Sequence, residues 1–366
     1  MERQFMQLAI GVISGTSMDG IDVAAIRTNG TNDIQRIAGT TFAYQPELRD
    51  RIAALLQDHQ SARYDPLESL EQAVARSHSK AVLAFLREHT ISANDVHIVG
   101  LHGQTVLHRP DTGFTRQLCD LEYAADLLGI DVIGDFRQAD VTAGGQGAPL
   151  APLYHQAITG GQPLPVIVLN WGGVGNITYI DKNTVLAFDC GPASAIIDDF
   201  VMRRTGNPFD RNGTLALSGT ADDMLVARLM QNEFFRTPPP KSLDRNHFHD
   251  LIGLDENIST ADGTATLTQF TIKATAAALV HCPQTPKTWI VCGGGRLNQA
   301  LMEGLQKSTN IPVQPIENIG FDGDFIEAEC FAWLAMRSLA GLPLSLPTTT
   351  GVPKPLTGGT LVRHRR

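Results

Sequence analysis

Short apolar runs alternate with polar, glycine-containing turns in the first part of the chain. Residues 8–13 and 21–26 are apolar and predict two strands, which a polar turn at 14–20 separates. A third strand is expected over 34–42. Apolar residues then recur at helical spacing between 66 and 89, which predicts a helix after the three strands.

The same order of elements recurs in the second half of the chain. Strands are expected at 166–170, 176–180 and 184–189, with a glycine-rich turn at 171–175 and a helix at 193–204. This repetition suggests a duplicated α/β architecture with facing halves. Two unrelated α/β units could give the same order by coincidence.

The last part of the chain carries another strand that opens into a glycine run. A short strand is expected at 289–292, followed by three glycines and a helix at 297–306. A final helix is expected at 327–339. The tail, residues 347–366, is rich in threonine and glycine and is expected to be irregular.

Length and charge narrow the class of protein. At 366 residues the chain exceeds what one hydrophobic core usually supports, so we expect two domains, residues 1–140 with 345–366 and residues 141–344. A net charge of -9 argues against a nucleic-acid partner, which would favour a basic face.

The lack of an expected targeting segment and the cysteine usage predict a cytoplasmic protein. The first residues lack the apolar segment of a signal peptide, and no apolar run approaches the ~20 residues that span a bilayer, so no membrane partner is expected. The five cysteines include no C-x-x-C pair, which is typical of reduced thiols and argues against a zinc site.

The turn at 14–20 is the most informative motif. Its glycines let the backbone present N–H groups to an anion, and its hydroxyls add donors. It lacks the G-K-[ST] ending of a Walker A loop and leads into a strand, so it would be a phosphate-binding hairpin of another type. An ordinary polar hairpin turn is the alternative. The candidate phosphate-binding residues are Ser14, Gly15, Thr16, Ser17, Met18, Asp19, Gly20 and Ile21.

Asp189 and the glycine run are candidates in the second half. A carboxylate at the end of a strand can act as a general base toward a hydroxyl or a water molecule. Asp189 could equally cap the following helix, and its position alone favours the cap. Gly293, Gly294 and Gly295 lie between strand and helix, where the backbone can approach a flat ring or a phosphate.

Polar side chains also follow two apolar runs at 96–101 and 130–133. We expect them at strand ends, where they could bind sugar hydroxyls, an amide or a carboxylate. Arg137 could pair with a carboxylate through two hydrogen bonds, whereas a lone His102 is more often structural. The loop at 143–149 could be a hinge, a substrate loop or a linker. The residues concerned are His102, Gln104, Thr105, Asp135 and Arg137.

Together these segments resemble the anhydro-N-acetylmuramic acid kinase family, within the actin/hexokinase/Hsp70-like phosphotransferases. The matching segments keep the order of the family and span nearly the whole chain. They are SGTSMDGID at 14–22, HGQT at 102–105, GDFR at 134–137, GQGAP at 145–149, NIT at 176–178, FDCGP at 188–192, DRNG at 210–213, CGGG at 292–295 and EAECFAW at 327–333.

The resemblance implies a two-domain actin-like ATPase fold (α/β, a duplicated ribonuclease H-like unit) with a central cleft for ATP. Residues 14–21 would bind the phosphates, and Gly293 to Gly295 the adenosine side. Asp189 matches the family's catalytic base, which would activate a water that attacks C1 of the anhydro sugar while O6 receives the γ-phosphoryl group. The resemblance also implies Mg²⁺, a homodimer, and Glu327 as a substrate-binding candidate, although Glu327 could simply be a first-turn helix acid.

Four positions in two segments depart from the family pattern. The residues after the catalytic aspartate are commonly Thr-Gly-Pro-Gly-Asn, and here they are Cys190, Gly191, Pro192, Ala193 and Ser194. Trp171 stands where a small aliphatic residue is expected. The loss of a threonine hydroxyl and of an amide affects the contacts expected around phosphate or substrate.

Three rival functions fit parts of the pattern. Another sugar or acid kinase would use the same architecture without the hydrolytic water. An Hsp70-like nucleotide switch would want a substrate-binding module after the ATPase, for which the chain is short. A glycoside hydrolase would need a second, acidic carboxyl group such as Asp135 or Asp210, and it would leave the phosphate loop without a purpose.

Overall fold

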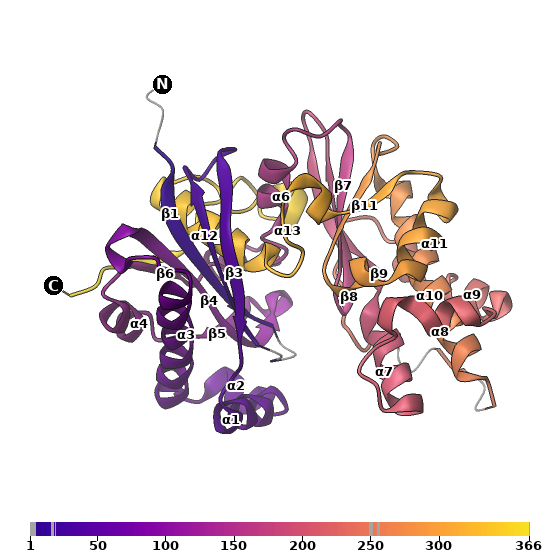
Figure 1. Cartoon of the computed structure of the whole chain (residues 1–366), viewed down its shortest axis with the longest axis horizontal. Coiled ribbons are helices and arrows are strands. Elements are labelled where there is room, and N and C mark those ends of the chain that lie inside the picture. The colour runs from indigo at the N-terminus through magenta and orange to yellow at the C-terminus, as the bar shows by residue number, and fades with distance from the viewer. Residues whose placement is uncertain (1–4, 16–17, 19, 249–251, 255–256, 366) are drawn as a thin grey trace. The chain divides into compact units, whose positions relative to one another are not determined.

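The protein divides into two compact units, each with its own sheet (Figure 1). The computed structural model describes residues 5–15, 18, 20–248, 252–254 and 257–365. The first unit comprises Met1–Gly160 and Phe325–Arg366, and the second comprises Gly161–Asp324. The chain therefore passes between units at 160/161 and 324/325, whereas the sequence suggested boundaries at 140/141 and 344/345.

The elements of the first unit surround a seven-stranded sheet. Its strands are β1 (Gln7–Ser14), β2 (Ile21–Thr28), β3 (Ile34–Phe42), β4 (Val96–Arg109), β5 (Phe114–Leu118), β6 (Val132–Gly134) and β12 (Thr360–Val362). Its α-helices are α1 (Pro46–Leu56), α2 (His59–Tyr64), α3 (Glu68–Glu88), α4 (Leu121–Leu128), α5 (Gln138–Thr142), α6 (Pro152–Ile158), α12 (Ile326–Leu339) and α13 (Pro347–Thr350).

The second unit is built on a five-stranded sheet. Its strands are β7 (Val166–Trp171), β8 (Val174–Ile180), β9 (Val185–Pro192), β10 (Trp289–Cys292) and β11 (Val313–Pro315). Its α-helices are α7 (Ser194–Thr205), α8 (Thr214–Ser218), α9 (Asp223–Leu229), α10 (Thr260–Ala277) and α11 (Gln299–Thr309).

The two sheets share one strand order, which confirms the predicted duplication. In the first unit the path is β6-β4-β1-β2-β3, and in the second it is β11-β10-β7-β8-β9. In both, the first three strands form an antiparallel meander, and two further strands run parallel to the first of them. The first unit adds β5 and β12 to this frame.

Opposite faces of the first sheet are covered by α3 and α12 (Figure 1). Along β1, Ile10 and Val12 belong to the core that includes the buried face of α3. The intervening Gly11 faces α12, where an added Cβ would lie 1.9 Å from the carbonyl oxygen of Ala328. Gly100 on β4 makes the same close approach, 2.2 Å from the Phe331 oxygen. These glycines let α12 pack directly on the sheet of the first unit.

Several expectations about elements were wrong, two of them because the elements depend on distant strand partners. The tail is not irregular, since it forms α13 and then β12, which pairs with β6. The strand expected at 96–101 continues to Arg109, because its later residues pair with β5. The helix expected at 297–306 begins at Gln299, after a 3₁₀ turn at Gly294–Leu297 and a cap by Asn298. Helices α1 and α2 were not anticipated.

Candidate active site

The predicted phosphate-binding turn joins β1 to β2 in the first unit. The N–H of Met18 donates to the carbonyl oxygen of Gly15 at 3.1 Å, and Met18 has a φ of 56°, in the left-handed region. Gly20 lies where a Cβ would come within 2.4 Å of Thr41 Cγ2, so a side chain would collide with β3. Three predicted residues lie outside the described part of the chain, namely Thr16, Ser17 and Asp19.

Four buried polar side chains meet beneath the start of this turn. The Ser14 hydroxyl is 2.8 Å from Gln104 Oε1 and 2.8 Å from the Tyr44 hydroxyl. His78 Nε2 lies 3.2 Å from Ser14 and 3.1 Å from Tyr44. Gln104 also donates through Nε2 to the Gly15 carbonyl at 3.2 Å. Gln104, expected to bind substrate, is therefore fully buried and hydrogen-bonded at both ends within the protein.

His102 supports Arg137. Because the Arg137 Nε–H can only donate, His102 Nε2 accepts it at 2.9 Å, and the ring proton sits on Nδ1, which donates to the Gly103 carbonyl at 2.9 Å. Burial, together with the Arg137 charge, holds the pKa of His102 well below its usual value. Both ring nitrogens of this neutral histidine are thus engaged within the protein.

The loop at 143–149 supplies the second contact of Arg137. Nη1 of Arg137 donates to the Gly147 carbonyl at 2.7 Å, while the Gly147 N–H donates to Asp140 Oδ1 at 2.6 Å. Asp140 also accepts a hydrogen bond from the Thr350 hydroxyl at 2.7 Å. The tail helix α13, which carries Thr350, therefore helps to hold this loop and the guanidinium group.

The remaining predicted residues of the first unit have different settings. Thr105 lies within β4 and accepts a hydrogen bond from Gln117 Nε2 at 3.3 Å. Asp135 follows β6 with an exposed side chain and a φ of 53°, a conformation that non-glycine residues adopt mainly at turns and functional sites. Glu327 lies in the first turn of α12 and is also exposed. Thus Thr105 lies within a strand, not at its end.

In the second unit a bulge in β9 presents Asp189. Asn176 pairs with Asp189 and Gly175 pairs with Gly191, so Cys190 is the additional residue on β9. Such bulges re-aim the neighbouring side chains and recur next to active sites. Gly191 has a φ of 153°, and an added Cβ would lie 2.7 Å from the Ala274 Cβ, so the bulge requires glycine there.

The Asp189 carboxylate is oriented by the segment around 241–243. Its Oδ2 accepts the N–H of Leu243 at 2.8 Å, and its own N–H donates to the Lys241 carbonyl at 3.1 Å. Burial raises the pKa of Asp189 to about 6, and the Leu243 hydrogen bond and the Lys241 charge oppose that rise. The expected helix-cap alternative is wrong, because Ala193 is the N-cap of α7 and no side chain caps that helix.

The glycine run after β10 forms a turn that packs on Trp171. Gly293 has a φ of 72°, and a Cβ there would lie 2.3 Å from Asn170 Oδ1. A Cβ on Gly295 would lie 2.5 Å from that of Trp171. At Gly294, by contrast, an added Cβ would meet nothing within 4 Å, so this glycine faces open space. An open face of this kind is suited to a flat ring or a phosphate.

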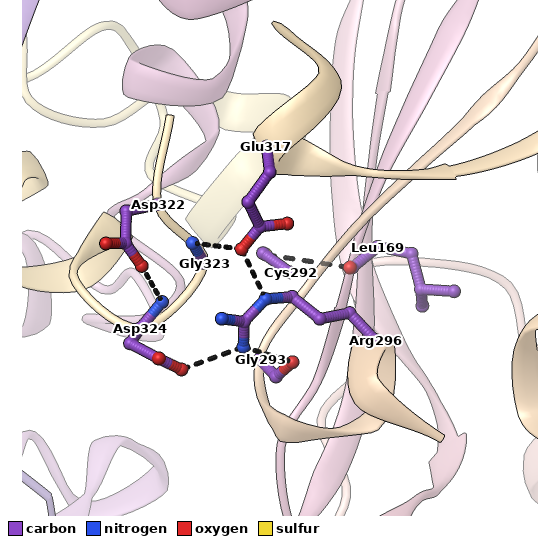
Figure 2. A network of polar contacts seen from close by, with 8 residues as sticks. All are labelled: Leu169, Cys292, Gly293, Arg296, Glu317, Asp322, Gly323 and Asp324. Atoms are coloured by element: carbon purple, nitrogen blue, oxygen red, sulfur yellow. Dashed lines mark hydrogen bonds and ion pairs between the residues drawn. The ribbon is translucent and has the colours of Figure 1, made fainter. Parts of the chain in front are cut away.

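Arg296 braces this glycine turn (Figure 2). Its Nε donates to Glu317 at 2.7 Å, and its Nη1 contacts Asp324 at 2.8 Å and the Gly293 carbonyl at 3.2 Å. The N–H of Gly323 reaches the same Glu317 oxygen at 3.1 Å. Because the guanidinium is nearly buried, both acids and the glycine turn are fixed to one another.

Two of the departures from the family pattern, Trp171 and Cys190, contact the same hydroxyl group. The Trp171 indole N–H donates to Thr275 Oγ1 at 3.0 Å, and the Cys190 sulfur lies 3.9 Å from the same oxygen. Trp171 and Cys190 are both buried. The tryptophan therefore has a physical role, because it connects the bulge that carries Asp189 with the turn at Gly293 and Gly295.

Asp210, considered as the acid of a glycoside hydrolase, accepts hydrogen bonds from the backbone. Its two oxygens accept the N–H groups of Leu215 and Ala216, at 2.9 and 3.0 Å. This structural role disfavours the hydrolase alternative.

Sequence reasoning missed four residues that hold the candidate site in place. Each lies far along the chain from the group it contacts, except Arg296, whose position next to the glycine run was the available signal. The missed residues are Tyr44, His78, Lys241 and Arg296.

The family model and the sequence relatives agree with the resemblance. A family model described as anhydro-N-acetylmuramic acid kinase matches residues 7–364. A protein of that name from Rhizorhabdus wittichii is 46% identical over 98% of this chain and 99% of its own length. One from Rhodospirillum rubrum is 44% identical over 96% of this chain and 93% of its length. A solved ROK family glucokinase from Streptomyces griseus, in complex with glucose and AMPPNP, is 15% identical with a TM-score of 0.41, over 90% of this chain and 99% of that one. The chain belongs to the anhydro-N-acetylmuramic acid kinase family.

Proposed function

We propose that this protein is an ATP-dependent kinase that opens 1,6-anhydro-N-acetylmuramic acid with water and phosphorylates O6. The products are N-acetylmuramic acid 6-phosphate and ADP, formed in the recycling of cell-wall sugar. Family membership supports the reaction. The single observation that carries the mechanism is the oriented, half-buried carboxylate of Asp189 with a pKa of about 6.

Asp189 is the proposed general base. With a pKa of about 6 the carboxylate is mostly ionised at pH 7, yet it is more basic than an exposed aspartate. One oxygen is held by Leu243, so the other can accept the proton of a water that attacks C1. The C1–O6 bond breaks, O6 takes the γ-phosphoryl group, and ADP leaves.

Residues 14–21 are proposed to bind the phosphates of ATP, and Gly293, Gly294 and Gly295 its adenosine side. The open face at Gly294 fits a flat ring, since a side chain would find no neighbour there. Phosphoryl transfer mainly requires positioning and neutralisation of charge, which a cradle of N–H and hydroxyl groups supplies.

A magnesium ion fits this arrangement as a companion of the nucleotide. Across the described residues, no three His, Cys, Asp or Glu side chains are grouped to hold a metal. Magnesium needs no such cage, because phosphates and water supply most of its ligands. Asp22, whose Oδ1 accepts the Thr41 hydroxyl at 2.6 Å, would bind its waters. When bound, the ion neutralises phosphate charge.

The predicted substrate residues divide into two roles. Arg137, Asp135 and Glu327 are proposed to contact the sugar, with Arg137 suited to a carboxylate. His102 and Gln104 are proposed to act through their neighbours, since their polar atoms already have protein partners. Thr105 remains a candidate for a sugar hydroxyl.

A cytoplasmic location and a homodimer complete the proposal. All five cysteines are free thiols, as expected in a reducing compartment. In the described part of the chain, no helix combines the length and apolar character needed to cross a membrane. Light scattering on the purified protein would test the dimer.

The deciding experiment measures ADP release with Mg·ATP and 1,6-anhydro-N-acetylmuramic acid, beside a panel of ordinary hexoses. We expect turnover with the anhydro sugar alone, and incorporation of ¹⁸O from labelled water at C1. Turnover on a simple hexose without ¹⁸O at C1 would instead establish the rival kinase, which needs no hydrolytic water. Absence of turnover on any of these sugars would reject the proposed function.

A further inference from the structure

A buried polar cluster lies beneath the turn between β1 and β2. It brings together Ser14 at the end of β1, Gln104 on β4, His78 on α3 and Tyr44 before α1. All four side chains are at most 7% exposed. Residues distant in sequence thus converge on the point where the chain leaves β1.

This cluster is an unusual occupant of an apolar core. The surrounding positions on β1, β2 and α3 are apolar, among them Val12, Ile21 and Val74. Burying hydroxyl, amide and imidazole groups costs free energy unless they bond to one another. His78 Nδ1 has no partner among the described residues, so the cluster is not fully satisfied. Stability alone therefore gives a weak reason for these side chains.

The cluster restrains the first two residues of the turn, Ser14 and Gly15. Gln104 Oε1 lies 2.8 Å from the Ser14 hydroxyl, and its Nε2 donates to the Gly15 carbonyl at 3.2 Å. That carbonyl also accepts the N–H of Met18, so both of its lone pairs are used. Because a peptide unit is planar, fixing this carbonyl fixes the plane in which the chain enters the turn.

We propose that Tyr44, His78 and Gln104 are positioning residues that hold Ser14 and Gly15, where the chain leaves β1, in place for binding the phosphates of ATP. Tyr44 and His78 orient the Ser14 hydroxyl, and Gln104 joins that hydroxyl to the Gly15 carbonyl. This inference rests on the proposed role of the turn in binding phosphate.

The cluster carries no charge. Burial lowers the pKa of His78 to about 4, so its ring is neutral near pH 7, and the other three groups are also neutral there. The cluster therefore positions Ser14 and Gly15 without attracting phosphate electrostatically, and the attraction is proposed to come from the turn. Because Ser14 and Gly15 are already fixed, less conformational entropy is lost there when the nucleotide binds.

The test compares nucleotides with and without phosphates. In the full-length protein, the Kd values of ADP and adenosine are measured for wild type, Tyr44→Phe and Gln104→Met. Tyr44→Phe removes one hydroxyl and keeps the ring, whereas Gln104→Met removes the amide oxygen and nitrogen, with all their hydrogen bonds, at similar volume. We expect the Kd of ADP to rise about fivefold or more in each variant, with adenosine affinity unchanged.

A matched control separates positioning from loss of stability. Tyr179→Phe also removes a hydroxyl from a buried ring, one that donates to Asp181 at 3.2 Å in the second unit. It should leave both affinities at the wild-type values. In the double variant Tyr44→Phe with Gln104→Met, the rise in Kd should be smaller than the product of the single effects, because both act through Ser14.

The outcomes distinguish this inference from the proposed function. If wild type binds ADP more tightly than adenosine and the cluster variants keep the same ratio of Kd values, the positioning role is wrong and the phosphate site stands. If wild type itself binds ADP no better than adenosine, the turn is no phosphate site, and both proposals fail. Loss of adenosine affinity to the same extent as ADP affinity would reduce the cluster to a structural role.

Discussion

The two units share a strand order but use their first hairpins differently. In the first unit, Gln104 on β4 is hydrogen-bonded to the Ser14 hydroxyl and the Gly15 carbonyl, where the turn between β1 and β2 begins. In the second, β7 and β8 are joined through Gly172 and Gly173, whose carbonyls accept the N–H groups at residues 193–195. The start of α7 is thus hydrogen-bonded to the hairpin of its own unit, whereas the first hairpin is held through side chains at the end of β1 and on β4.

This difference shows where a duplicated fold can carry distinct chemistry. The backbone frame is repeated, but the candidate anion site of the first unit lies in its first turn. In the second unit the proposed general base, Asp189, lies at a bulge on the third strand, and the glycines follow β10. Loss of the reaction without loss of nucleotide binding should therefore follow from changes in the second unit at Asp189.

The largest expected effect is on Asp189→Asn. Removing the proposed base should lower kcat by about 10²- to 10⁴-fold while nucleotide affinity remains near wild type. Asp198→Asn is the matched control, since Asp198 is another carboxyl of the second unit whose burial raises its pKa to about 7. Steady-state ADP release measures both variants. Equal losses in the two variants would contradict a specific role for Asp189.

Two neighbouring glycines of the turn after β10 should differ in how much an alanine substitution destabilises the protein. Gly293→Ala places a Cβ against Asn170 at a left-handed φ, so we expect a loss of about 2–3 kcal/mol in the free energy of unfolding. Gly294→Ala finds open space and should change it by less than about 0.5 kcal/mol. Urea unfolding measures both. A similar loss at Gly294 would show that the turn is more tightly enclosed than its contacts indicate.

A smaller difference in stability is expected between alanine substitutions in the first hairpins of the two units. Gly20→Ala brings a Cβ to 2.4 Å from Thr41 Cγ2, which should cost about 1–2 kcal/mol of stability. Gly173→Ala meets the Ala195 Cβ at an ordinary 3.5 Å, and should cost less than about 0.5 kcal/mol. Thermal unfolding of the two variants compares them directly. The reverse order would break the contrast between the hairpins.

The pH dependence of the reaction should belong to the second unit. Ionised Asp189 is lost as the pH falls through about 6, so kcat/KM should fall about tenfold per pH unit below that value. The Lys241 charge lowers the pKa of Asp189, so Lys241→Met should move this limb to higher pH and reduce activity about two- to fivefold at pH 6. An acid limb unchanged in Lys241→Met would assign it to another group.

The contribution of Asp189 to protein stability should decrease with rising pH, whereas its contribution to activity should increase. Because burial raises the pKa of Asp189 from 3.8 to about 6, the folded state holds more protons than the unfolded state between these values. Its contribution to stability therefore falls as the pH rises through this window. Asp189→Asn should accordingly unfold at an equal or higher temperature than wild type at pH 7.

Much of the frame could be predicted from local sequence. The strands around 8–13, 21–26 and 289–292 and the helices at 66–89 and 327–339 have strong periodic signals, and the structure confirms them. Irregular segments gave weaker signals. β12 forms only because β6 offers a free edge, and β4 continues to Arg109 only because β5 pairs with it.

Family and chemistry were determined by the sequence itself, through short motifs in a fixed order that the family match confirms. Tertiary structure decided which polar side chains are free to act. It engages His102 and Gln104 within the protein, and it turns Asp189 through a bulge that no local pattern marks. The physical reason is that a hydrogen bond depends on partners brought together by packing. Residue type fixes what a side chain can do, and its distant neighbours fix what it does.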